Sequence, residues 1–182
     1  MIHLPSLDEL SQRICIVGPS SSGKSTLADA IGRHAGLPVI HLDQLHHLPH
    51  TAWQPRPREA FHALHDAAIA QDRWVIDGNY SSCMPQRMAR ATGFILLDVP
   101  TLTSLRRYLH RTLFERRRIG GLEGAPERVR MDMLRHIVVA TPANRVRYGT
   151  MYDALPLPKV RLSSTRAVDE AYASWQLERE CP

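Results

Sequence analysis

The stretch Ile14-Cys-Ile-Val-Gly18-Pro-Ser-Ser-Ser-Gly23-Lys24-Ser25-Thr26 decides the fold. It begins with four apolar residues, continues with the pattern G-x-x-x-x-G-K-[ST] and leads into a helical pattern. A strand, such a loop and a helix in this order are typical of a phosphate-binding site. An ordinary glycine-serine turn is the alternative, but a turn needs neither the lysine nor the hydroxyl at these offsets. The sequence therefore predicts a nucleotide-binding domain.

Each residue type in this loop has a physical role. Gly18 and Gly23 allow the backbone N–H groups to turn toward phosphate oxygens, and the helix that begins near Lys24 adds the positive end of its dipole. We expect Lys24 to bridge the terminal phosphates and the Ser25 hydroxyl to bind Mg²⁺. The residues expected to hold the nucleotide are Gly18, Pro19, Ser20, Ser21, Ser22, Gly23, Lys24, Ser25 and Thr26.

Five short apolar runs predict β-strands at residues 14–17, 39–42, 74–77, 94–99 and 159–162. Helical patterns lie between the runs, at about 24–34, 58–70, from 101 onward, 127–148 and 168–178, and Pro142 is expected to kink or break the fourth helix. Strands that alternate with helices predict an α/β fold with a parallel sheet covered on both faces.

The composition limits the class of protein. A chain of 182 residues with a net charge of +5 is long enough for one domain, and the charge favours an anionic partner, either a nucleotide or a nucleic acid. The three cysteines lack the spacing of a zinc site or a disulfide framework. No stretch has the length or the pattern of a membrane span or a signal peptide, so we expect a soluble cytoplasmic protein. Residues 1–13 predict a short appended helix without an assigned role.

Two aspartates follow predicted strands and are candidates for the chemistry. Asp77 closes the third strand before Gly78, which suits the second Mg²⁺-organising position of a phosphate-loop protein, although Asp-Gly is also an ordinary turn. Asp43 follows the second strand and should lie at the same sheet edge. We expect Asp43 to orient the metal or to accept a proton from an acceptor hydroxyl, and a helix N-cap or turn is an equal alternative.

The segment from about 44 to 70 is expected to bind the phosphoryl acceptor. Four histidines cluster around its start: His41, His46, His47 and His50. Their spacing matches no standard zinc pattern, so a polar lip of the acceptor site is favoured over a metal site. Trp53, Arg56 and Arg58 follow in a loop rich in proline. They predict either an aromatic and cationic site for an anion or a capped loop edge.

An arginine stripe follows the fourth strand. Arg107, Arg111 and Arg118 recur at helical spacing, opposite a leucine stripe at Leu102, Leu105 and Leu109. The stripe runs into a glycine-rich segment, so we expect a lid at about 112–126 whose arginines stabilise the charge of a transferring phosphoryl group. A solvated helix face is the alternative. Arg145 and Arg147 would complete such an arginine cage.

Taken together, these motifs resemble the adenylate-kinase-like branch of P-loop kinases. The resemblance rests on the loop 18–26, on Asp77-Gly78, and on Leu97-Asp98-Val99-Pro100 with Arg107 and Arg111 seven and eleven residues after the proline. It implies a three-layer P-loop fold like that of nucleoside monophosphate kinases, with a short lid. It further implies that Arg107 lies against adenine, that Arg111 contacts the phosphates and that residues 163–167 line the adenine pocket.

Over residues 13–165 the chain more closely resembles bacterial proteins identified as DNA topology modulation proteins or adenylate-kinase-related kinases. The residues concerned are the runs 39–43, 55–59 and 72–80 together with Trp53. One position departs from adenylate kinases. The arginine that holds their acceptor monophosphate, four residues after the aspartate of Asp-Gly, is Ser81 here. AMP is therefore doubtful as the acceptor unless Arg56, Arg58 or Arg87 supplies the missing charge.

Three functions are consistent with these residues. The leading hypothesis is a kinase that transfers the γ-phosphoryl group of Mg·ATP to a nucleotide or a small hydroxylated acceptor, with Lys24, Arg107, Arg111 and Asp43 as the reacting-site residues. The second is a nucleic-acid-associated ATPase, for which the chain lacks a recognisable DNA-binding motif. The third is a nucleotide-binding protein that has lost catalysis.

Overall fold

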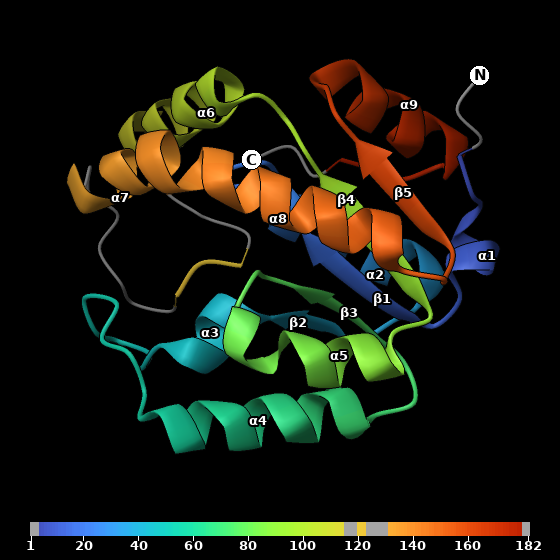
Figure 1. Ribbon diagram of the computed structural model, residues 1–182, viewed down its shortest axis with the longest axis horizontal. Coiled ribbons are helices and arrows are strands. Elements are labelled where there is room, and N and C mark those ends of the chain that lie inside the picture. Colours follow the sequence, from blue (N-terminus) through green and yellow to red (C-terminus); the bar gives the residue numbers. More distant parts are fainter. Residues whose placement is uncertain (1–3, 115–119, 123–130, 180–182) are drawn as a thin grey trace.

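The computed structural model describes residues 4–114, 120–122 and 131–179, and its centre is a five-stranded parallel sheet (Figure 1). The strand order is β2-β3-β1-β4-β5, so the strand before the phosphate loop occupies the middle. The strands are β1 (Arg13–Val17), β2 (Val39–His41), β3 (Trp74–Asp77), β4 (Gly93–Leu97) and β5 (Lys159–Leu162). Because all strands run in parallel, their carboxyl ends meet at one edge, where ligands bind in open α/β sheets.

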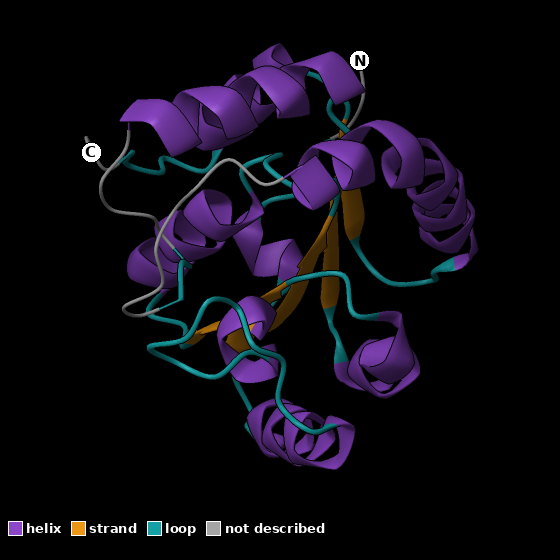
Figure 2. Ribbon diagram, turned by 90° about the vertical axis from the view of Figure 1, so that its left-hand side faces the viewer, coloured by secondary structure: helices purple, strands orange, loops and turns teal. Residues whose placement is uncertain are grey.

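Helices cover both faces of this sheet, as the turned view in Figure 2 shows. On one face lie α1 (Leu7–Leu10), α2 (Lys24–Ala35) and α9 (Thr165–Ser174), and on the other lie α4 (Arg58–Ala70), α5 (Met84–Arg90) and α8 (Thr141–Ala154). The side chains of β1 alternate between the two cores: Ile14 and Ile16 pack on the first, Cys15 and Val17 on the second. The fold is therefore three-layered, as predicted.

Most predicted elements lie within a few residues of their observed bounds. The helix after the phosphate loop ends at Gly36, which has left-handed backbone angles as a C-cap. Two strand ends were predicted too far along the chain. β2 ends at His41, and a short helix, α3 (Leu42–His46), begins at the next residue, so Asp43 lies in the first turn of a helix. β4 ends at Leu97 instead of residue 99.

The segment after β4 differs more from expectation. In α6 (Thr101–Phe114) two members of the predicted leucine stripe face solvent, Leu102 at 76% and Leu109 at 36% exposed, whereas Ser104 and Tyr108 are buried. The predicted break near Pro142 takes the form of a π-helical segment, η2 (His136–Ala140), between α7 (Met131–Arg135) and α8. A π segment is a recognised way to accommodate a local irregularity within a helix.

The N-terminal helix α1 docks on the body at the sheet edge remote from the phosphate loop. Ser6 and Glu9 form a reciprocal capping box that starts the helix. Leu10 is fully buried, and a Cβ on Gly93 would lie 2.4 Å from its carbonyl oxygen. The Trp175 indole N–H donates to the Pro5 carbonyl at 2.8 Å. None of the helices in the described ranges combines the length and apolar character that crossing a membrane requires.

Candidate active site

The phosphate loop connects β1 to α2 through glycines with unusual backbone angles. Gly18 has φ +152° and Gly23 has φ +98°, values that side chains with a Cβ rarely adopt. A Cβ on Gly18 would lie 2.2 Å from the carbonyl oxygen of Leu97 in β4. The first glycine is therefore needed for close approach to the neighbouring strand and the second for entry into the helix.

The side chains of the loop surround the N-terminal end of α2. Lys24 Nζ donates to the Pro19 carbonyl at 2.8 Å, which folds the lysine back over the loop. The hydroxyls of Ser21 and Ser22 are buried and have no hydrogen-bond partner among the described residues. Buried polar groups are normally paired, so these hydroxyls and the amides of the α2 N-terminus suit an anion with several oxygen acceptors.

Asp77 and Ser25 meet at the carboxyl edge of the sheet. The Ser25 hydroxyl donates to Asp77 Oδ2 at 2.7 Å, and Asp77 is 5% exposed. A hydroxyl and a carboxylate are the oxygen ligands that Mg²⁺ prefers, so the two residues fit this ion. Asp77 also accepts a hydrogen bond on Oδ1 from His41, at 2.6 Å. The predicted proximity of Ser25 and Asp77 is thus present.

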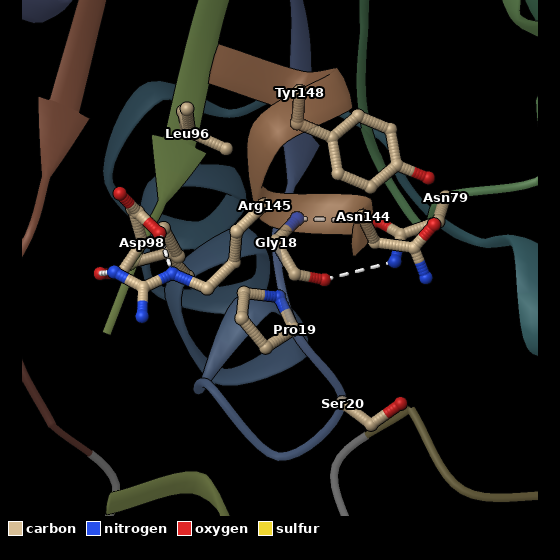
Figure 3. Close-up of a pocket in the computed structure, with 10 residues that line it drawn as sticks. Gly18, Pro19, Ser20, Asn79, Leu96, Asp98, Asn144, Arg145 and Tyr148 are labelled. Atoms are coloured by element: carbon tan, nitrogen blue, oxygen red, sulfur yellow. Dashed lines mark hydrogen bonds and ion pairs between the residues drawn. The ribbon is translucent and has the colours of Figure 1, made fainter. Parts of the chain in front are cut away.

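Asn79, which the sequence did not single out, fixes the start of the loop (Figure 3). Its Oδ1 accepts from the Gly18 N–H at 3.1 Å, and its Nδ2 donates to the Gly18 carbonyl at 2.9 Å. This two-point pairing joins the turn after β3 to the turn after β1. An amide following Asp-Gly was the available signal, but only the pairing of β1 with β3 shows its partner.

Arg107 contacts the phosphate loop directly, whereas Arg145 lines a pocket beside the loop with Gly18, Pro19 and Ser20 (Figure 3). Arg107 Nη1 donates to the Ser22 carbonyl at 2.8 Å, and burial lowers the pKa of this guanidinium. Arg145 on α8 instead donates to Asp98 Oδ1 at 2.5 Å (Figure 3). Burial would raise the pKa of Asp98, but its bonds to Arg145 and Arg161 outweigh burial and lower it. Arg145 is therefore bound to the carboxylate after β4.

Of the other arginines in the predicted cage, Arg147 has a described side chain. Arg147 donates to the Tyr148 hydroxyl at 2.8 Å and stacks on its ring. The Arg111 side chain and Arg118 fall outside the described residues, as does most of the predicted lid at 112–126. The described piece 120–122 lies at the site. Gln44 donates to the Gly121 carbonyl at 2.9 Å, and a Cβ on Gly120 would lie 2.8 Å from Ser25 Oγ.

Asp43 occupies the opposite side of the carboxyl edge from Arg107, toward α4. It accepts a hydrogen bond from the Tyr80 hydroxyl at 2.7 Å. Burial and the neighbouring Asp43 carboxylate raise the pKa of Tyr80 far above its usual value, so the phenol stays a donor. Because Asp43 follows His41 by two residues, it lies within the turn that leads from β2 to the segment 44–70.

Aromatic rings form the wall beside Asp43. The His46 ring packs on Phe61 with centroids 5.0 Å apart and on Tyr80 at 4.7 Å, and His47 packs edge-on against Trp53 at 5.2 Å. Burial and the adjacent His47 lower the pKa of His46. Among the residues that the structure describes, no group of three or more histidine, cysteine or acidic side chains is arranged to hold a metal ion. His50 lies in the loop beyond, with φ +59°.

The three arginines proposed to replace the missing acceptor arginine differ in availability. Arg87 is fully buried, and its guanidinium donates to the Gly78 carbonyl at 3.0 Å, the Asn79 carbonyl at 3.4 Å and the Met84 sulfur at 3.3 Å. It supports the backbone after Asp77 from within the core. Arg58 is exposed at the first position of α4, and Arg56 is partly buried in the preceding loop.

Comparisons with known proteins establish the fold. Neither the protein-family models nor the curated proteins include a match. Solved structures that match include a gluconokinase from Sinorhizobium meliloti 1021, at 17% identity over 92% of this chain and 93% of that one, with a TM-score of 0.50. A shikimate kinase from Bacteroides thetaiotaomicron is 16% identical over 91% and 96% of the two chains, with a TM-score of 0.52.

A third similar structure is the shikimate kinase from Acinetobacter baumannii in complex with shikimate. It is 15% identical over 93% of this chain and 94% of that one, with a TM-score of 0.54. These similarities span almost the full length of both chains, but the sequence identity is low. They therefore show the fold and do not show the activity. The predicted three-layer α/β P-loop fold with a five-stranded parallel sheet is confirmed: the chain has the fold of small P-loop kinases.

Proposed function

We propose that this protein is a small ATP-dependent kinase. The observation that carries the proposal is the hydrogen bond between Ser25 and Asp77, 2.7 Å long, at the open end of a loop with the phosphate-binding pattern. A chance glycine turn would not bring a hydroxyl and a buried carboxylate together beside unpaired serine hydroxyls. The kinase names of the similar structures agree with this proposal.

The donor is ATP, held through its phosphates. The loop amides and Lys24 bind the β- and γ-phosphate oxygens, and Arg107, which already contacts the loop at Ser22, lies near the charge that spreads over the transferring group. Ser25 and Asp77 hold Mg²⁺, which neutralises phosphate charge when it is bound. Arg111 belongs to the same helix as Arg107 and is proposed to act beside it.

The acceptor reacts through a hydroxyl oriented by Asp43. The hydroxyl oxygen forms a bond to the γ-phosphorus while the bond from that phosphorus to the β,γ-bridging oxygen breaks, so ADP leaves with the bond electrons. The hydroxyl proton passes to the Asp43 carboxylate, which Tyr80 holds in position through its hydrogen bond. The segment 44–70 supplies the remaining contacts to the acceptor.

The acceptor side favours a small hydroxylated molecule over a nucleoside monophosphate. Ser81 carries no charge, and the Arg87 guanidinium is committed to backbone carbonyls and a sulfur. The wall beside Asp43 consists of packed aromatic and histidine rings. Two of the similar structures are kinases named for small molecules, gluconate and shikimate, and not for nucleotides.

A turnover screen tests this function. Purified protein with Mg·ATP is offered nucleosides, nucleoside monophosphates, polyols and hydroxylated acids, and ADP and phosphorylated acceptor are measured together. We expect ADP to appear in equal amount to one phosphorylated product, and Lys24→Ala to reduce turnover at least about 100-fold. Equal rates with and without acceptor would indicate an ATPase, and full activity in Lys24→Ala would refute the donor assignment.

The same protein tests the other two functions. The adenylate-kinase-like subtype and the link to DNA topology modulation remain predictions from the sequence. A nucleic-acid-associated ATPase would bind duplex DNA, most tightly at low salt, because phosphate contacts weaken as salt rises. A protein that has lost catalysis would bind ATP tightly and yield no product with any acceptor.

A further inference from the structure

Four side chains form a continuous hydrogen-bonded chain behind the phosphate loop. Ser25 Oγ donates to Asp77 Oδ2 at 2.7 Å, and Asp77 Oδ1 lies 2.6 Å from His41 Nδ1. The other ring nitrogen of His41, Nε2, lies 3.0 Å from Asp29 Oδ1. The proposed roles of Ser25 and Asp77 do not account for His41 and Asp29.

The fold brings these four residues together through two simple spacings. His41 and Asp77 end neighbouring parallel strands and are direct partners in the register of β2 and β3, so their side chains emerge on the same face. Ser25 and Asp29 are four residues apart on α2, which covers that face, so they lie one above the other. Each residue on α2 therefore contacts one residue at a strand end: Ser25 contacts Asp77, and Asp29 contacts His41.

Both nitrogens of the His41 ring are engaged by carboxylates. Nδ1 lies 2.6 Å from Asp77 and Nε2 lies 3.0 Å from Asp29, so the ring is held at two points. The ring is also enclosed, with a side chain 10% exposed, and Asp77 is 7% exposed on the same measure. A carboxylate in such surroundings needs a partner for its charge, and Asp77 has the imidazole on one oxygen and a hydroxyl on the other.

This chain lies directly at the reacting edge of the site. Gly120, with φ +67°, approaches so closely that a Cβ there would lie 2.9 Å from His41 Nδ1 and 2.8 Å from Ser25 Oγ. The backbone at Gly120, in the predicted lid region, therefore lies against His41 Nδ1, the atom that pairs with Asp77. The His41 ring at this position influences the orientation of the Asp77 carboxylate.

We propose that His41, held by Asp29, is a positioning residue that fixes the Asp77 carboxylate for the metal ion of the nucleotide complex. The inference rests on the proposed function in that it takes the donor site as a Mg·nucleotide site. His41 acts on the metal only through Asp77, and Asp29 acts only through His41. Partners that orient a metal ligand in this way typically contribute tenfold to hundredfold to metal affinity.

The test is a binding measurement that needs no phosphoryl acceptor. Mn²⁺ is titrated into the full chain with saturating ADP, and bound Mn²⁺ is followed by electron paramagnetic resonance. We expect His41→Gln to weaken Mn²⁺ binding tenfold or more while metal-free ADP binds as in the wild type. The control is His34→Gln, the same change at an exposed histidine of α2, which should leave Mn²⁺ affinity unchanged.

A double-mutant cycle separates positioning from general damage. Asp29→Ala should weaken Mn²⁺ binding several-fold, and the variant with both changes should bind no more weakly than His41→Gln, because Asp29 acts through His41. Melting temperatures identify unfolded variants. If His41→Gln does not fold, Asp29→Asn takes its place, and it should weaken Mn²⁺ binding without altering binding of metal-free ADP.

The outcomes distinguish this inference from the proposed function. Unchanged Mn²⁺ affinity in a folded His41→Gln protein, or fully additive effects of the two changes, would overturn the positioning role alone. Absence of Mn²⁺·ADP binding in the wild type would overturn both proposals. Weakened Mn²⁺ binding in a protein that phosphorylates no acceptor would support the positioning role and count against the kinase.

Discussion

The donor side and the acceptor side of the carboxyl edge are built in different ways. On the donor side, short polar contacts link loop, helix and strand: Ser25 to Asp77, Asn79 to Gly18, Arg107 to Ser22. On the acceptor side, one carboxylate, Asp43, lies beside packed rings. In the proposed kinase, the donor side faces the phosphates of ATP, and the acceptor side faces a molecule that reacts through a hydroxyl. The contrast teaches that hydrogen-bonding groups fix the side proposed to bind phosphates, and that packed rings shape the side proposed to bind the acceptor.

The largest expected effect is a loss of turnover on changing Asp43, on the acceptor side. Asp43→Asn keeps the shape and the bond from Tyr80 but removes the proton acceptor, so turnover should fall about 100- to 10,000-fold. ATP affinity should stay unchanged, because the phosphate loop is untouched. Turnover is measured with the acceptor found in the screen and ATP binding by calorimetry. Asp72→Asn, at an exposed aspartate, is the control, and equal loss of ATP affinity in Asp43→Asn would undo the separation.

The next effect concerns the donor side alone. Gly18→Ala introduces a Cβ 2.2 Å from the Leu97 carbonyl oxygen at φ +152°, so the free energy of unfolding should fall by about 3 kcal/mol. Gly36→Ala is the matched control. Its φ is +62°, but nothing lies within 4 Å of the new Cβ, so it should cost only about 1 kcal/mol. Urea unfolding measures both, and equal losses would mean that the contact with β4 is unimportant.

These two glycines also show how far a sequence can be interpreted. The phosphate loop and Asp77 were predictable because their residues lie in short contiguous motifs next to apolar runs. Gly36 was predictable as a helix end. The contact that makes Gly18 indispensable is with Leu97, which is distant in sequence and adjacent only through the pairing of β1 with β4.

The acceptor side was less predictable for the same reason. The buried position of Arg87 depends on packing of α5 beneath the turn after β3, and no local pattern marks it. His41 was predicted only as part of a polar lip of the acceptor site, but strand register pairs it with Asp77 on the donor side. Asp43 was assigned to a strand end, although a helix begins at Leu42. Long-range pairing, more than local propensity, decides these roles.

A moderate effect tests how Asp43 is held. Tyr80→Phe removes the donor to Asp43 and keeps the ring that packs on His46 and Phe61. The carboxylate then loses one fixed orientation, so kcat should fall about tenfold, with KM for ATP unchanged. Steady-state kinetics measures this split. Tyr152→Phe, which keeps a ring stacked under Lys159, should leave kcat unchanged. A wild-type kcat in Tyr80→Phe would show that Asp43 needs no such support.

The smallest effect is a pH dependence of the acceptor side. His65 on α4 is fully buried, and burial lowers its pKa below the usual 6.5, with nearby Arg87 acting in the same direction against the bond to Asp66. The neutral ring therefore stabilises the fold above about pH 6.5, and this contribution is lost as pH falls through the folded-state pKa. The slope cannot exceed about 1.4 kcal/mol per pH unit for one proton.

Urea unfolding between pH 7.5 and 5 measures this contribution. His65→Leu should flatten the decline in unfolding free energy toward acid, whereas His62→Leu, at a less buried position of the same helix, should not. An unchanged decline in His65→Leu would place the acid sensitivity elsewhere in the molecule.

The central position of β1 has a consequence for how the chain acquires its structure. The strand pairs with β3 and β4, and the contacts from Gly18 to Asn79 and from Arg13 to Thr92 join residues 61 and 79 positions apart. Closing loops of this length costs chain entropy before any contact repays it. During synthesis the phosphate loop therefore leaves the ribosome long before its neighbouring strands exist. Nucleotide can stabilise the complete domain by mass action. Before β3 and β4 have been synthesised, however, the phosphate loop is not formed and offers nucleotide no binding site.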